Sequence, residues 1–95
     1  MKKATDLRRM IDELAEERGV FRSDAYVFAL EALEQAMKSQ ATPQHITGVD
    51  LLEWLVLLGR ERYGPMAPDV FNSWGVHNTL DFGRIVFHLV DQGLL

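Results

Sequence analysis

Three histidines and one aspartate are the side chains in this chain best suited to binding a metal ion. They are His45, His77, His88 and Asp81. Asp81 and His88 are seven residues apart, which places them on one face of a helix. A zinc site needs three or four converging ligands, and its histidines usually come as a pair with a spacing such as His-x₃-His. The sequence contains no such pair, so we expect no metal site.

Catalysis by a nucleophile or by paired carboxylates is not indicated either. Ser23, Ser39 and Ser73 stand outside the Gly-x-Ser-x-Gly pattern of a hydrolase. Glu16 and Glu17 are adjacent, but they fall on the charged face of a predicted helix. The glycines are too widely spaced for a dinucleotide loop, and the chain has no cysteine. We therefore expect no enzymatic activity and no cofactor.

Composition and charge limit the possible partners. The chain has 95 residues, 47% of them apolar, which suits one helical domain over 1–95. Residues 1–22, a charged N-terminal helix, carry six Lys or Arg and five Asp or Glu. The core, residues 23–95, carries four Lys or Arg and nine Asp or Glu. Such an acidic core disfavours nucleic-acid binding. The longest apolar run, 54–58, is too short to insert in a membrane, and we see no signal peptide, so we expect a cytoplasmic protein.

Apolar residues recur with helical spacing in five segments. The predicted helices cover residues 5–18, 23–39, 66–74 and 79–92, with a further helix that follows a capping box at Thr47–Asp50 and ends near Tyr63. Ser23 and Thr79 are the predicted N-caps. Residues 40–46 are a predicted loop, in which Pro43 interrupts helical structure. The pattern predicts an all-α, single-domain bundle of four main helices plus one short helix.

The width of each apolar face predicts where the helices lie. The first helix has a narrow stripe, formed by Leu7, Met10, Ile11 and Leu14. The last helix has only a thin polar stripe, formed by Asp81, Arg84, His88, Asp91 and Gln92. We therefore expect the last helix at the centre of the bundle, and the helix over 23–39, whose face includes Met37, against two neighbours. Gly59 and Gly83 lie inside predicted helices, where glycine costs about 1 kcal/mol of helix stability relative to alanine. We expect close helix crossings at both positions, because such packing would offset this cost.

Four large apolar residues fall within or beside the polar faces of their helices. They are Trp54, Leu57, Leu80 and Phe87. One interpretation is that the first helix packs over one or both of these patches. The other is that they form an exposed surface that binds a partner protein or a second copy. We take them as the candidate partner-binding residues.

The order of the last three helices resembles helix-turn-helix and winged-helix domains, in which a short helix and a turn precede the recognition helix. In that case Asn78, Arg84 and His88 would contact nucleic acid. Asp81 and Asp91 flank them and would repel phosphate, so a solvated helix face is the favoured interpretation.

Four stretches that cover most of the chain also carry a family resemblance. They are DAYVFALEAL (24–33), ITGVDLLEWL (46–55), YGPMAPDVFNSWGV (63–76) and TLDFGRIVFHLVDQGLL (79–95). They resemble a family of small bacterial conserved hypothetical proteins whose hallmark is Trp-Gly-Val, Thr-x-Asp-Phe-Gly-x-Ile-Val-Phe and Gly-Leu-Leu. His88 stands where the family has Asn, and its members continue beyond Gly-Leu-Leu into an acidic tail. The resemblance implies a bacterial protein but no particular activity.

Together these observations favour a small cytoplasmic bacterial accessory protein that acts by protein–protein interaction, by itself or as a subunit of a larger assembly. The alternative is a helix-turn-helix or winged-helix-like module that binds nucleic acid.

Overall fold

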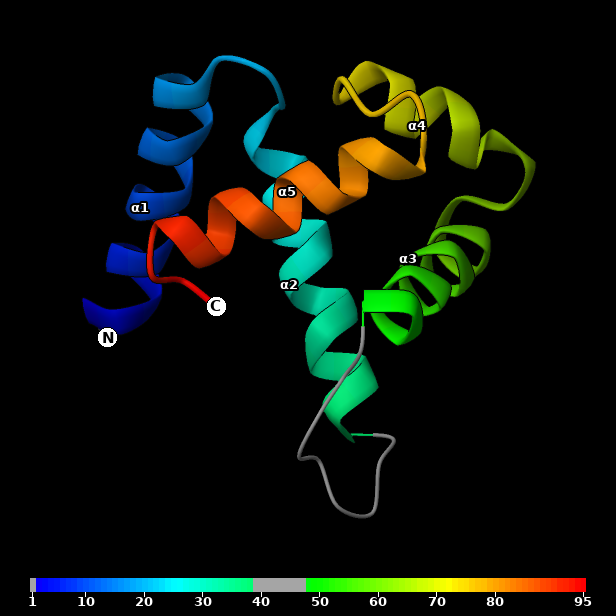
Figure 1. Cartoon of the computed structure of the whole chain (residues 1–95), viewed down its shortest axis with the longest axis horizontal. Helices are drawn as coiled ribbons and strands as arrows, with labels where there is room; N and C mark the ends of the chain where they lie inside the picture. The colour runs from blue at the N-terminus through cyan, green and yellow to red at the C-terminus, as the bar shows by residue number, and fades with distance from the viewer. Residues whose placement is uncertain (1, 39–47) are drawn as a thin grey trace.

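The structure, a computed structural model, describes residues 2–38 and 48–95, and its regular elements in these ranges are all helices (Figure 1). They are α1 (Lys2–Arg18), α2 (Ser23–Lys38), α3 (Gly48–Tyr63), the 3₁₀ turn η1 (Gly64–Met66), α4 (Ala67–Ser73) and α5 (Thr79–Asp91). The predicted all-α class is confirmed, and the helix ends agree with the prediction to within about three residues. The predicted loop over 40–46 and the cap at Thr47 lie outside the described residues.

Helix α2, rather than α5, is the centre of the bundle. It contacts α1, α3 and α5, and α5 crosses in front of it in Figure 1. One stripe of α2 consists of small buried residues: Ala25, Ala29, Ala32 and Ala36. Such side chains let neighbouring helices approach closely. The predictions of a central last helix and of two neighbours for α2 were therefore wrong, because a broad apolar face need not be covered on all sides.

An aromatic cluster ties α3, α4 and α5 to α2. Its rings are those of Phe28, Tyr63, Phe71, Trp74 and Phe82. The Phe28 centroid lies 5.4 Å from those of Phe71 and Trp74, and the Phe71 centroid lies 5.3 Å from that of Phe82. A Cβ on Gly59 would lie 2.5 Å from Cζ of Phe71, so glycine is what admits this ring. The close helix crossing predicted at Gly59 is instead a close contact with one side chain of α4.

Two turns that are far apart in sequence fix where α5 begins. The backbone N–H of Arg22, after α1, donates to the carbonyl oxygen of Trp74, after α4, at 3.0 Å. Gly75 has a φ of +91°, and a Cβ there would lie 2.7 Å from the carbonyl oxygen of Val20. Both the backbone conformation and the close approach require glycine at this position.

Helix α1 packs through its second half. Ile11 and Leu14 are buried as predicted, whereas Leu7 and Met10 are exposed. The first half of α1 extends away from α2, toward the N-terminal end seen at the lower left of Figure 1. Met37, predicted on the buried face of α2, is exposed near the other end of that helix. Leu7 and Met10 lie in the half of α1 that diverges from α2, and Met37 lies at the end of α2, so in both places no neighbouring helix among the described residues covers the apolar stripe.

Enlarging one alanine of the α2 stripe should destabilise the protein. Ala32→Leu inserts three carbon atoms at a fully buried site, and we expect a loss of about 1–3 kcal/mol in the free energy of unfolding. Gln35→Leu, at an exposed position of the same helix, is the matched control and should change it by less than about 0.5 kcal/mol. Urea denaturation measures both, and equal losses would contradict the central position of α2.

Candidate functional site

The first turn of α5 is held by two polar side chains. Oδ1 of Asn78 accepts a hydrogen bond from the backbone N–H of Asp81 at 3.0 Å. Oδ2 of Asp81 accepts one from the backbone N–H of His77 at 2.9 Å. Thr79 is the first helical residue, but the cap is Asn78, which corrects the predicted Thr cap. Asp81, predicted on the solvated stripe, is buried because its short side chain folds back onto the preceding backbone.

His88 joins α5 to the core. Its Nδ1 lies 2.8 Å from the hydroxyl of Tyr26, which is itself fully buried. The solvated position predicted for His88 was therefore wrong. Burial lowers the pKa of His88; Arg18 and Arg84 act in the same direction, and Asp91 opposes them. The neutral imidazole is thus the favoured form in the folded protein.

The imagined metal ligands do not converge. Nδ1 of His77 lies 2.8 Å from Oδ1 of Asn72, whereas His88 is bonded to Tyr26. Within residues 2–38 and 48–95, no three His, Asp or Glu side chains are grouped so that they could hold a metal ion. A search of the same ranges finds no helix long and apolar enough to cross a membrane.

The surface of α5 that points away from α2 is mainly apolar. Leu80, Phe87 and Val90 are 63%, 62% and 53% exposed, and Gly83 lies between them with open space where a Cβ would be. We call these four residues the outward face of α5. The interpretation that the first helix packs over one or both patches was wrong for Leu57, Leu80 and Phe87, since all three are exposed while α1 packs on α2.

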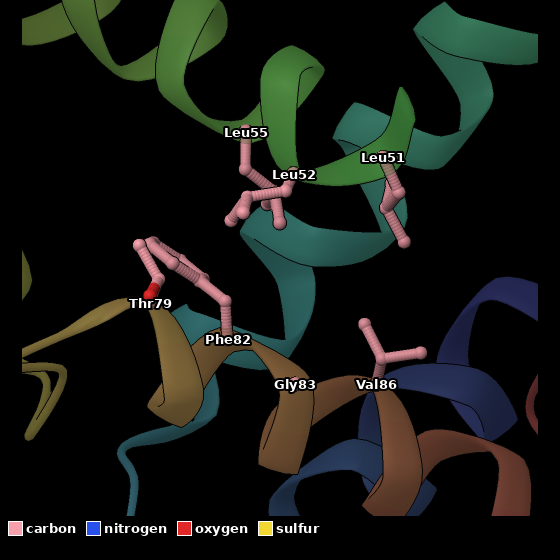
Figure 2. A pocket seen from close by; sticks show the side chains of 7 residues that line it. All are labelled: Leu51, Leu52, Leu55, Thr79, Phe82, Gly83 and Val86. Atoms are coloured by element: carbon pink, nitrogen blue, oxygen red, sulfur yellow. The ribbon is translucent and has the colours of Figure 1, made fainter. Parts of the chain in front are cut away.

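A groove between α3 and α5 continues the outward face (Figure 2). It has a volume of about 180 Å³ and is lined by Leu51, Leu52, Leu55, Thr79, Phe82, Gly83 and Val86. The leucines of α3 point toward Phe82 and Val86 of α5 across the gap in Figure 2. Gly83 belongs to both the groove and the outward face. The helix crossing predicted at Gly83 was wrong, because its missing side chain leaves space open instead of admitting another helix.

The other two candidate residues lie apart from this surface. Trp54 and Leu57 line a shallow hollow on α3 together with Asp50 and Glu53. Trp54 is half-buried against the core, and Leu57 is 47% exposed. The hollow shares no lining residue with the α3–α5 groove. Leu80 and Phe87 thus share the outward face of α5, whereas the hollow that contains Trp54 and Leu57 is lined by α3 residues.

Sequence reasoning missed several residues of the combined surface. Gly83 was interpreted as a crossing point, and neither Val86 nor Val90 was named as a candidate for partner binding. Their positions carried a signal, since Gly83 and Val90 stand four residues before and three residues after Phe87, on one helix face. The sequence carried no such signal for the leucines of α3, because residues that line a groove recur with the same helical spacing as residues of the core.

The three candidate nucleic-acid contacts do not form one free polar surface. The side-chain oxygen of Asn78 caps α5, and Nδ1 of His88 is bonded to Tyr26. The side chain of Arg84 is 57% exposed, with Nη1 3.4 Å from Oδ1 of Asp81. The centre of the exposed side of α5 is occupied by apolar residues.

The stability of the protein should fall in acid because of His88. The pKa of His88 is lower in the folded protein than its value of about 6.5 in an unfolded chain. Its contribution to the free energy of unfolding is therefore complete above about pH 6.5 and is lost as the pH falls toward the folded-state pKa. His88→Gln stays neutral and can still bond Tyr26, so it should remove this part of the pH dependence. Urea denaturation between about pH 8 and 5 measures it, and identical slopes for both proteins would contradict the assignment.

Comparison with known proteins adds no further information about this surface. A scan against protein-family models and searches of curated proteins and of solved structures found no match to the chain. The resemblance to a family of small bacterial proteins stays a prediction from the sequence.

Proposed function

We propose that this protein is a small accessory protein of the bacterial cytoplasm that acts by protein–protein interaction, and that the outward face of α5 with the α3–α5 groove is its contact surface. The observation that carries the proposal is the exposure of Leu80, Phe87 and Val90 on one helix face. A contiguous apolar patch on a small protein is typical of an interaction site. An exposed aromatic residue at its centre is typical of the anchor of such a site.

Energetics support a contact surface. Complete burial of one large apolar side chain is worth about 1.5–3 kcal/mol, and three such side chains stand exposed together here. The first helix, the one element that the sequence offered as a cover, packs on α2. A partner that covers the outward face would recover this free energy.

The dimensions of the groove favour a protein partner over a small ligand. Its volume of about 180 Å³ is below the roughly 300–1,000 Å³ of ordinary ligand pockets. Thr79 contributes a hydroxyl, and the other lining residues are apolar or glycine, whereas ligand sites place several polar groups. The groove suits one or two apolar side chains that project from a partner helix.

The alternative from the sequence, a helix-turn-helix-like module that binds nucleic acid, has less support. A recognition helix needs free polar side chains on the side that enters the major groove. In α5 that side is centred on Phe87, while Asn78 and His88 make bonds within the protein. The acidic charge of residues 23–95 also opposes contact with phosphate.

Removal of the apolar anchors should abolish partner capture. The chain would be tagged in the organism that encodes it, with a differently tagged copy present, and purified under native conditions as wild type and as Leu80→Ser/Phe87→Ser. With chemical crosslinking in the cells before purification, we expect at least one protein, a second copy included, to be recovered with wild type and to fall at least about tenfold with the double variant.

Met66→Ser is the matched control, because Met66 is 57% exposed and lies in η1, away from the outward face. It should retain wild-type capture. The proposal is contradicted if nothing is recovered with wild type, or if the double variant recovers the same proteins in the same amounts while remaining folded by circular dichroism.

A further inference from the structure

We infer that the outward face of α5 binds a second copy of this chain, in an antiparallel, two-fold pairing of the two α5 helices centred on Phe87. The inference rests on the proposed function, since it names the occupant of the same surface. A two-fold interface uses one patch twice, so the patch must be complementary to itself. The residues of α5 meet that condition in both shape and charge.

The apolar residues match themselves across such an axis. In an antiparallel pair, each residue before Phe87 faces the residue equally far after the partner's Phe87. The two Phe87 rings, each 62% exposed, then meet at the axis. Leu80, seven residues before Phe87, lies beyond the level of Asp91, the last residue of the partner's α5, so it stands at the margin of the pairing. Val90, three residues after Phe87, is level with position 84 of the second copy, one residue from the partner's Gly83, whose open space can receive it. The two Phe87 rings and the two Val90–Gly83 contacts are therefore the apolar part of the pairing.

The charges are complementary in the same register. Arg84 and Asp91 stand seven residues apart, on the same edge of the outward face. In an antiparallel two-fold pair, the same edge of both helices lies on the same side of the interface. Arg84, three residues before Phe87, is then level with position 90 of the second copy, one residue or about 1.5 Å from the partner's Asp91. Two Arg84–Asp91 pairs form, one on each side of the axis.

Both members of each pair are accessible. The side chains of Arg84 and Asp91 are 57% and 53% exposed. Within the chain Arg84 has a long contact, 3.4 Å to Asp81. Asp91 accepts from Arg18 through Oδ2, which leaves its Oδ1 directed elsewhere. A carboxylate can accept from two guanidinium groups at once, so pairing between copies does not require the bond to Arg18 to break.

Gly83 gains an explanation from this pairing. Glycine weakens a helix interior, and no helix of the same chain crosses α5 closely at this position within the described residues. On the outward face, a missing side chain lets a second helix approach the backbone. One helix pair buries less than the roughly 1,600 Å² of a standard interface, so we expect a dimer that forms at high micromolar concentration.

Charge exchange between two variants tests the register. Arg84→Glu would place two carboxylates at each contact of a homodimer, and Asp91→Lys would place two cations there. We expect each variant to dimerise at least about tenfold more weakly than wild type in sedimentation velocity. An equimolar mixture restores opposite charges at both contacts and should regain wild-type dimerisation. Arg60→Glu, an exposed change of the same size on α3, is the control and should behave as wild type.

A wild-type protein that is monomeric up to about 1 mM overturns the inference, as does a mixture no more dimeric than its components. If Asp91→Lys fails to fold, an equimolar mixture of Arg84→Cys and Asp91→Cys, which keeps Phe87, replaces it. The chain has no cysteine, so oxidation can link only these introduced positions. We expect disulfide dimers to form at least about tenfold faster than with Met66→Cys, which is equally exposed but off the face. Equal rates overturn the pairing.

The outcomes separate the two proposals. Native capture of a different protein that depends on Leu80 and Phe87, together with a monomeric wild type, overturns self-pairing and leaves the proposed function intact. A monomeric wild type that captures nothing contradicts both.

Discussion

Close packing around the buried alanines of α2 is the contact on which the rest of this structure depends. Helices α1, α3 and α5 all contact this one 16-residue helix, and its small buried side chains let neighbouring backbones approach closely. Helix α5 is then held by Phe82, Ile85 and Leu89, which are buried on one of its faces. Phe87 lies on the opposite side of the helix, so it must point to solvent. Its exposure follows from the same packing that stabilises the bundle.

A second set of contacts determines what lies beside Phe87. The aromatic cluster around Phe71 and the hydrogen bond between Arg22 and Trp74 fix the short helix α4 and the start of α5. Helices α3 and α5 are thus each anchored to other parts of the bundle, and between them the apolar groove of Figure 2 remains. The groove and the outward face of α5 meet at Gly83, and together they form the surface to which we assign function.

Much of the fold could be predicted from the sequence, because helical spacing and the residues at helix ends are local signals. The helices came from such signals. What failed depended on packing between elements. A wide apolar face on α5 indicated a central helix, yet it reflects a buried face and an exposed one on opposite sides. Asp81 and His88 were predicted to face solvent because they are polar. Instead, Asp81 is bonded to the preceding turn and His88 to Tyr26, and residue spacing predicts neither bond. Leu80 and Phe87 were identified correctly as unusual for their helix face, but their exposure could be established only once α1 was placed.

The central claim is that the outward face of α5 is a contact surface between copies of this chain. The most direct measurement is the concentration dependence of side-chain NMR signals from Leu80, Phe87 and Val90, with those of Leu57 and Met66 as references of comparable exposure. The account predicts that the three α5 signals shift together as the protein is concentrated to about 1 mM, while the references stay unchanged. Signals of α5 that do not move over that range, or references that move as much, would contradict it.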